Sequence, residues 1–200
     1  MNNTNQKIVP EARSSVSLSE LKTAAVAIIL IEKYSKIKND FEYSIVFGQR
    51  SNKIRYHKGQ IAFPGGSLDK EDENLKETAI RETCEEIGIN IDLNSSEWEF
   101  LGQYPKNFIT VSDFLITPFI FVYRLKNGGK LNFKPDGSEI IEVFEVPMEH
   151  LLDPANLSME KREWQGNIID MYFYRFNGKT IWGITGWLLH DFLSSLTKIA

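Results

Sequence analysis

The chain has 200 residues, of which 42% are apolar and 25% charged, and its formal net charge is −4. A chain of this size and composition can bury the core of one ordinary globular domain without help from disulfides. The negative charge argues against nucleic acid as the partner, since polyanion-binding proteins usually carry a basic patch. The single cysteine, Cys84, excludes an internal disulfide and suits a reducing compartment.

Residues 1–16 are polar and lack the apolar stretch of a signal peptide. We interpret them as a flexible N-terminal extension, followed by a single domain over residues 17–200. The longest apolar run, residues 24–31, is far shorter than the ~20 residues that cross a bilayer. We therefore expect a cytoplasmic protein that makes no contact with membranes.

The first predicted elements are two strands. Residues 24–31 form a continuous apolar run rich in β-branched side chains, which predicts a strand buried on both faces. Residues 43–47 predict its partner strand, across a charged linker at 32–42.

Helical spacing follows over residues 74–87. The pattern turns four side chains toward the core and places the acidic residues on the opposite side. These four are Leu75, Ala79, Ile80 and Cys84. Gly88 supplies the C-terminal stop, because glycine readily adopts the left-handed conformation that ends helices.

The rest of the chain predicts three more strands and two helices. The strands are expected at 98–104, 115–123 and 141–146, and the helices at 147–152 and 186–196. Elements that alternate in this way predict an α/β fold with a sheet between helices.

Three glutamates are the most informative residues of the predicted helix. Glu82, Glu85 and Glu86 stand at i, i+3 and i+4, so their carboxylates project from one helical face. Like charges so placed repel each other unless cations neutralise them, and hard divalent ions such as Mg²⁺ take carboxylate and phosphate oxygens. Taken alone, such a face is more often solvated surface than a site.

The run Arg81 to Ile89, RETCEEIGI, resembles the second half of the Nudix box, G-x5-E-x7-R-E-U-x-E-E-x-G-U with U apolar. Thr83 departs from it at the first apolar position. The first half aligns in two ways: Gly66 with Asp72 and one extra residue before Arg81, or Ser67 with Glu73. We prefer the first, because a glycine is hard to replace where the backbone φ is positive or a ligand approaches closely.

The residues before the box are similar to one branch of that family, the coenzyme A pyrophosphatases. Arg50-Ser51 and the run 55–66, RYHKGQIAFPGG, resemble the R-S-x3-R-x-H-x-G-Q-x-x-F-P-G-G stretch of these enzymes. The resemblance extends over residues 20–195. It implies an α/β/α sandwich with a mixed central sheet, and hydrolysis of the diphosphate bond of coenzyme A or acyl-CoA. The products would be 4′-phosphopantetheine, free or acylated, and adenosine 3′,5′-bisphosphate.

The resemblance also implies a metal site with Mg²⁺ or Mn²⁺ as the cofactor. Glu82, Glu85 and Glu86 would be the ligands, together with the backbone carbonyl of Gly66. Arg81 would complete the catalytic set as a charge-assisted partner that fixes a carboxylate beside the metals. A solvent-exposed helix arginine is the alternative.

The general base stays open at this point, because Nudix enzymes take it from different places. Glu82 or Glu85 would serve from the helix, and Glu139 or Glu142 from a later segment. For the two later acids, an ordinary surface position is an equally good interpretation.

A basic cluster precedes the glycine pair and predicts substrate binding. Arg50, Arg55, His57 and Lys58, with Gln60, would meet the 3′-phosphate or the diphosphate of coenzyme A. A solvated hairpin connection is the alternative, and the resemblance favours binding. Aromatic residues clustered late in the chain would mainly pack, with one of them stacking an adenine. That cluster comprises Trp164, Tyr172, Phe173, Tyr174, Phe176 and Trp182.

Two other functions remain open. The same box would serve hydrolysis of ADP-ribose, NADH or a nucleoside triphosphate, because it addresses only the diphosphate. A non-catalytic domain that binds a nucleotide is less favoured, because all three glutamates are present. Free versus acylated substrate, Mg²⁺ versus Mn²⁺ and the number of metals are not fixed by the sequence, which would also permit a homodimer.

Overall fold

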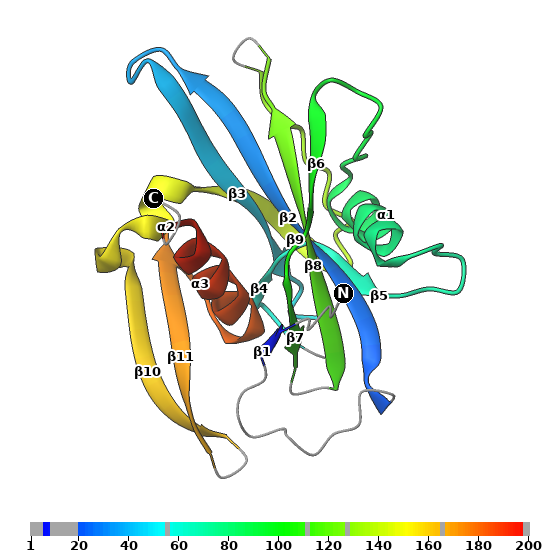
Figure 1. Cartoon of the computed structure of the whole chain (residues 1–200), viewed down its shortest axis with the longest axis vertical. Helices are drawn as coiled ribbons and strands as arrows, with labels where there is room; N and C mark the ends of the chain where they lie inside the picture. The colour runs from blue at the N-terminus through cyan, green and yellow to red at the C-terminus, as the bar shows by residue number, and fades with distance from the viewer. Residues whose placement is uncertain are drawn as a thin grey trace.

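The computed structural model describes residues 6–8, 20–54, 57–110, 113–126, 129–164 and 167–197. Within them, nine strands form one mixed sheet, with helix α1 (Leu75–Ile87) on one face and helix α3 (Gly183–Thr197) on the other (Figure 1). The strands are β1 (Gln6–Ile8), β2 (Lys22–Ser35), β3 (Asp40–Arg50), β4 (Ile61–Ala62), β5 (Gly65–Ser67), β6 (Trp98–Gln103), β7 (Lys106–Ile109), β8 (Phe114–Arg124) and β9 (Ile140–Pro147). This arrangement confirms the predicted α/β/α sandwich.

Strand β2 is the centre of the sheet, parallel to β8 and antiparallel to β3. Its side chains alternate between two cores, because successive residues of a strand point to opposite faces. Ala25, Ala27 and Ile29 pack on the α1 side, and Ile28 and Leu30 on the α3 side. The prediction of a strand buried on both faces is confirmed.

The predicted linker at 32–42 is wrong. Strand β2 continues to Ser35 and β3 begins at Asp40, so only a short turn separates them. Charged and aromatic side chains pair across this hairpin, as in the 2.8 Å hydrogen bond from the Tyr43 hydroxyl to Glu32. The charged residues of this hairpin lie at strand ends that face solvent. Polar side chains are compatible with a strand at such positions.

Helix α1 begins and ends as its sequence predicts. The Asn74 side chain accepts hydrogen bonds from the backbone N–H groups of Lys76 and Glu77, and Gly88 has a φ of 69°. The core assignment of Cys84 is wrong, since Cys84 is exposed. Thr83 is buried in its place and donates its hydroxyl to the Ala79 carbonyl at 2.7 Å. That internal bond lets a polar side chain occupy the core face.

The other predicted elements are present with shifted ends. The predicted strands 98–104, 115–123 and 141–146 correspond to β6, β8 and β9, with β6 ending at Gln103. Residues 147–152 contain α2 (Met148–Leu152), and α3 begins three residues before the predicted start at 186. In the predicted N-terminal extension, Gln6–Ile8 forms β1, which pairs with β7, and its other residues lie outside the described part of the chain.

A second sheet was not predicted. It is formed by β10 (Leu157–Trp164), β11 (Asn167–Phe176) and β12 (Lys179–Ile181), after the short 3₁₀ helix Pro154–Asn156. The long hairpin β10–β11 stands beside α3 (Figure 1), where Tyr172 stacks on His190 at 3.7 Å between ring centres. Some of the late aromatic residues thus pack the hairpin against α3.

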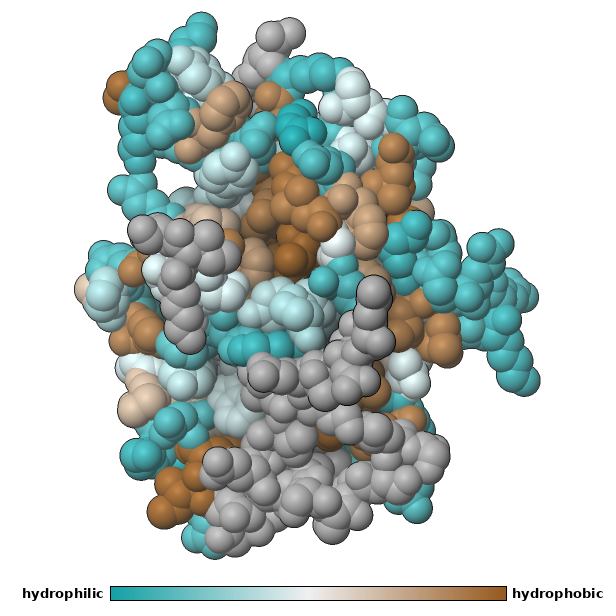
Figure 2. Space-filling view, viewed as in Figure 1, coloured by the Kyte–Doolittle hydropathy of each residue, from teal (hydrophilic) through white to brown (hydrophobic). Residues whose placement is uncertain are grey.

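The surface is hydrophilic around much of the face in Figure 2, with an apolar area in its upper centre. Of the helices in the described residues, none is long and apolar enough to cross a membrane.

Candidate active site

The glycine pair brings the chain against both the central strand and helix α1. Gly65 and Gly66 form β5 with Ser67 and pair with Val26 and Ala25 of β2. Gly65 has a φ of 151°, and a Cβ there would collide with the backbone of β2. At Gly66 a Cβ would lie 2.5 Å from the Glu82 carboxylate. Only glycine lets this backbone lie directly on that carboxylate.

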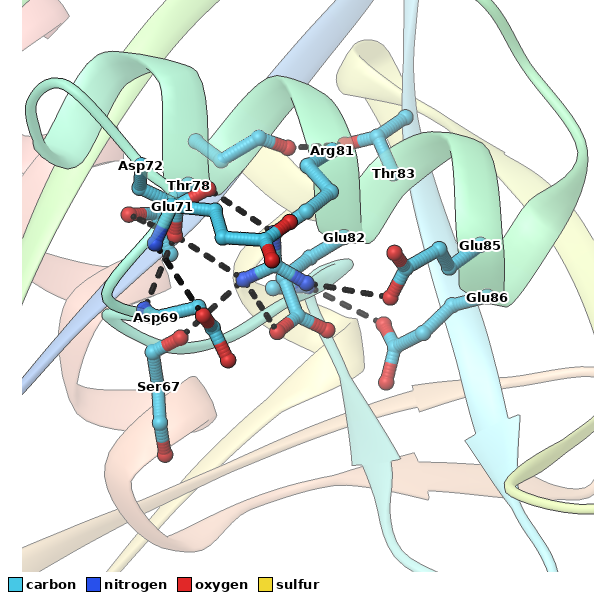
Figure 3. Close-up of polar contacts among 12 residues, drawn as sticks. Ser67, Asp69, Glu71, Asp72, Thr78, Arg81, Glu82, Thr83, Glu85 and Glu86 are labelled. Atoms are coloured by element: carbon cyan, nitrogen blue, oxygen red, sulfur yellow. Dashed lines mark hydrogen bonds and ion pairs between the residues drawn. The ribbon is translucent and has the colours of Figure 1, made fainter.

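Arg81 contacts several carboxylates around the acidic face of α1 (Figure 3). Its guanidinium lies 3.0 Å from a carboxylate oxygen of Glu82 and 3.0 Å from one of Glu85. It also donates to the Ser67 carbonyl of β5 at 3.2 Å. Arg81 therefore joins the helix acids to the glycine loop.

Asp72 is the strongest partner of Arg81. Its two oxygens accept from Nε and Nη2 of Arg81 at 2.9 and 3.0 Å, and its side chain is only 4% exposed. The Arg81 hydrogen bonds hold the pKa of Asp72 well below its usual range, although burial opposes them. The neighbouring Glu73 is exposed. The geometry therefore favours the alignment that places Gly66 and Asp72 in the box, with one extra residue before Arg81.

Glu86 and Glu82 are unusually buried carboxylates, with side chains 7% and 17% exposed. Burial raises the pKa of Glu86 to about 7. A 3.0 Å hydrogen bond from the Gly65 N–H and the charge of Arg50 oppose that increase. Burial also raises the pKa of Glu82, against the opposing charge of Arg81. A cation bound beside two such buried acids would favour their ionised form.

The adjacent ends of β3 and β9 bring Arg50 and Glu139 to this group. The pairing of β3 with β9 shifts register at Arg50, and the backbone N–H of Ser51 donates to the Glu139 carbonyl at 2.7 Å. Arg50 lies 3.7 Å from Glu86 and 3.3 Å from Glu139. The charge of Glu139 contributes to the raised pKa of both Glu82 and Glu86.

The other late candidate for the general base lies apart from this group. Glu142 forms a 2.8 Å ion pair with Lys179, which also donates to Gln49. Of the two acids that the sequence left open in this segment, the structure therefore brings only Glu139 to the helix carboxylates.

A cavity of about 210 Å³ opens beside the glycine pair. Arg50, His57, Gln60, Gly65 and Gly66 are among its lining residues. His57 Nδ1 and Gln60 Oε1 lie 3.0 Å apart, and His57 has a φ of 57° in the connecting loop. The predicted substrate residues Arg50, His57 and Gln60 are thus brought together, whereas Arg55 lies outside the described residues.

The donor set suits a hard divalent cation in its chemistry. Three carboxylates of one helix turn lie beside a backbone that a Cβ would obstruct, and two of them are buried. In the described part of the chain, no three acidic, histidine or cysteine side chains already surround a common point. Arg81 and Arg50 hold the carboxylates instead, so a cation would replace these guanidinium contacts on Glu82 and Glu86.

Asp72 was missed as a site residue by the sequence analysis, which considered it only in the alignment of the box. The feature of the sequence that pointed to Asp72 was its place at the acid position of the motif. Its buried hydrogen bond from Thr78 Oγ1, at 2.9 Å, could not be predicted from residue spacing.

Comparisons with known proteins show which family the chain belongs to. The model of the NUDIX domain family matches residues 21–168. The mitochondrial Nudix hydrolase 15 of Arabidopsis thaliana is 34% identical over 84% of this chain and 56% of its own length. An uncharacterized Nudix hydrolase, NudL, of Photorhabdus laumondii is 32% identical over 74% of each chain. The chain thus spans little more than half of the first relative and about three quarters of the second.

Solved structures support the fold alone, since their sequence identity is low. The binary complex of an Ap4A hydrolase from Caenorhabditis elegans has a TM-score of 0.51 at 16% identity, covering 88% of this chain and 98% of that chain. A MutT/nudix family protein from Enterococcus faecalis has a TM-score of 0.50 at 13% identity, covering 94% and 66%. Because the NUDIX domain model matches residues 21–168 and a 32% identical relative is matched over 74% of each chain, the chain belongs to the family of Nudix hydrolases.

Proposed function

We propose that this Nudix hydrolase cleaves the diphosphate bond of coenzyme A or acyl-CoA, giving 4′-phosphopantetheine, free or acylated, and adenosine 3′,5′-bisphosphate. One observation carries the proposal. The cavity that contains Arg50, His57 and Gln60 is continuous with the glycine pair on which Glu82 and Glu86 lie. A diphosphate in that cavity would meet basic groups on one side and the acidic helix on the other.

Glu82, Glu86 and the Gly66 carbonyl would hold Mg²⁺ or Mn²⁺, with the more exposed Glu85 as a further ligand. Such ions neutralise the negative charge of the diphosphate and make a bound water more acidic. Arg81 keeps its bidentate contact with Asp72 while it releases a helix carboxylate, so the helix face stays anchored to the loop.

Hydrolysis needs a water oxygen to attack phosphorus while the bridging P–O bond breaks. Glu139 is our candidate for the base that accepts the proton of that water, because its charge acts on Glu82 and Glu86 and its solvent-exposed carboxylate pairs with Arg50, which lines the cavity. Arg50 would bind a phosphate oxygen with the guanidinium that now contacts Glu86 and Glu139.

The substrate branch rests on the loop before the glycine pair. Its resemblance to the coenzyme A pyrophosphatases is supported by the physical convergence of Arg50, His57 and Gln60 on one cavity. ADP-ribose, NADH and nucleoside triphosphates share the diphosphate and are the competing substrates. A panel of these compounds at equal concentration, with kcat/KM for each, ranks them against coenzyme A.

Product analysis with coenzyme A and Mg²⁺ or Mn²⁺ tests the proposal. Wild type should release adenosine 3′,5′-bisphosphate, and Glu86→Gln should lose at least about a hundredfold in kcat, because it removes the charge of a buried metal ligand. Glu77→Gln is the matched control, since Glu77 is an acid of the same helix that pairs with Lys76. Equal turnover by Glu86→Gln and wild type would refute the metal site, and a preference for ADP-ribose would refute the substrate.

A further inference from the structure

A second cavity of about 320 Å³ adjoins the first. It lies between the start of α3 and the hairpin β10–β11, and it shares four lining residues with the cavity beside the glycine pair. These are His57, Gln60, Thr110 and Ile184. A group bonded directly to a diphosphate in the first cavity would therefore reach the second.

The wall of the second cavity is apolar and aromatic. It includes Ile169 and Met171 of β11, Trp182 just before α3 and Trp187 on α3. Trp187 donates its indole N–H to the backbone carbonyl of Asp170, so its ring is held by the hairpin. Such a wall suits a flat, weakly polar ring, because stacking on aromatic side chains depends on the ring face.

One positively charged side chain, that of Arg162, also lines this cavity. Arg162 of β10 faces the cavity opposite Ile169 of β11. Its guanidinium lies 5.5 Å from the centre of the Phe173 ring, and Phe173 is in turn stacked with Trp182 at 6.2 Å between ring centres. Its Nε and Nη2 donate to Glu160 at 3.1 and 2.8 Å. The Phe173 ring and Glu160 hold the guanidinium in place beside the aromatic wall.

We infer that this cavity binds the nucleoside part of the substrate, with the purine on Trp182 and Trp187 and with Arg162 paired to a phosphate on the ribose. The inference rests on the proposed function and deepens it. A nucleoside is bonded directly to the diphosphate, whereas the acyl group of an acyl-CoA lies at the far end of the pantetheine arm. The pantoyl group beside the diphosphate is neither flat nor anionic, so it would use neither the indoles nor Arg162.

Arg162 would therefore be a specificity-determining residue. The 3′-phosphate distinguishes coenzyme A from dephospho-coenzyme A, ADP-ribose and NADH, and an arginine offers two N–H donors in the geometry that a phosphate accepts. Glu160 competes for the same guanidinium and would move aside when the phosphate binds.

Calorimetric binding of two ligands to the full chain tests this without turnover. Adenosine 3′,5′-bisphosphate carries the ribose 3′-phosphate and AMP lacks it. Wild type should bind the bisphosphate about tenfold more tightly than AMP, and Arg162→Gln should bind the two ligands with nearly equal affinity. Trp182→Leu, at a partly exposed position, should weaken both ligands by a similar factor.

Lys161→Gln is the matched control. Lys161 is the preceding residue of the same strand, its side chain lies on the opposite face, and it pairs with Asp170 at 3.2 Å. It should keep the wild-type preference. The inference is overturned if Arg162→Gln keeps the preference, if Lys161→Gln loses it equally, or if neither ligand binds wild type.

The two proposals fail separately. Cleavage of coenzyme A by wild type, with a preference for the bisphosphate that does not depend on Arg162, would refute this binding cavity and leave the proposed function intact. Binding of the bisphosphate through Arg162 without cleavage of coenzyme A would refute the function and leave the cavity assignment intact.

Discussion

At the scale of single residues, the site is built on pairs of opposite charge that are partly removed from water. Arg81 holds Asp72, Glu82 and Glu85 together, and Arg50 lies between Glu86 and Glu139. Breaking such a pair costs more than the pair contributes, because the remaining charge stays buried without its partner.

The Arg81–Asp72 pair gives a stability prediction. Arg81→Gln should lower the free energy of unfolding by about 3 kcal/mol, since it leaves the Asp72 carboxylate buried and unpaired. Adding Asp72→Asn should recover part of that loss, because the double variant has no unpaired charge. Urea unfolding of the two single variants and the double variant measures the coupling.

The neighbouring acid is the control for this cycle. Glu73 is exposed, so Glu73→Gln should change stability by no more than about 0.5 kcal/mol. If Glu73→Gln proved as costly as Asp72→Asn, the alignment of the box that places Asp72 in the motif would be wrong.

Glu86 gives a prediction about pH. Burial raises the pKa of its carboxyl from an ordinary 4.5 to about 7 in the folded chain, so the folded state binds the proton more tightly than the unfolded state. The metal-free protein should therefore lose stability as pH rises from 4.5 to 7, by about 3 kcal/mol from this group, and level off above that window.

Urea unfolding in the presence of a chelator, at pH 5 and pH 8, checks the prediction. Glu86→Gln has no such titration, so the stability difference between it and wild type should grow in favour of the variant at pH 8. A constant difference across the two pH values would contradict the raised pKa of Glu86.

At the scale of elements, local signals predicted α1 and failed at the second sheet. Asn74, the helical spacing and Gly88 define a helix through its own sequence, and the structure confirms its ends. The phase of its buried face was misjudged at Cys84, because Thr83 satisfies its own hydroxyl and can be buried. Strands β10 and β11 were not predicted, because their side chains pack on α3 and on each other, contacts that periodicity does not reveal.

The part of the candidate site that lies on one helix was predictable, because local spacing along the sequence defines it. The helix glutamates follow a fixed spacing, so Glu82, Glu85 and Glu86 could be grouped from sequence alone. Glu139 is brought to Arg50 by the register of β3 with β9, and Arg162 is brought to the adjoining cavity by that of β10 with β11. Tertiary pairing of that kind leaves only weak traces in a single sequence.

Strand β5 gives a prediction that separates folding from chemistry. Gly65→Ala should destabilise the fold by at least about 1–3 kcal/mol, because its φ is positive and its Cβ would meet the backbone of β2. Gly66→Ala should cost much less stability, because its Cβ would meet only the movable end of the Glu82 side chain. Displacing that carboxylate should nevertheless lower kcat by tenfold or more.

Thermal unfolding and kcat of the two variants, measured side by side, decide the matter. Each variant is the control for the other, since the same methyl group is added one residue apart in the same strand. Full activity in Gly66→Ala would show that the contact between Gly66 and Glu82 plays no part in catalysis.

At the scale of the whole molecule, the site and the cavity beside it take residues from all three layers of the sandwich. Helix α1 brings the acids from one face, the ends of β3 and β9 bring Arg50 and Glu139, and the cavities extend to α3 on the other face. Binding at this junction should therefore be coupled to the stability of the whole domain, because the elements that would separate on unfolding all contribute to it.

Divalent cations test that coupling. Mg²⁺ or Mn²⁺ at a hundred times its dissociation constant should add about 2.7 kcal/mol to the free energy of unfolding, because a site absent from the unfolded chain stabilises by mass action. The increase in melting temperature should be larger at pH 8 than at pH 6, since protons compete for Glu86, whose pKa is raised to about 7. Glu82→Gln and Glu86→Gln should lose most of the increase, whereas Glu77→Gln, on the same helix and paired with Lys76, should keep it. An increase of equal size in all four proteins would place the cation elsewhere on the molecule and separate the carboxylates of α1 from the proposed chemistry.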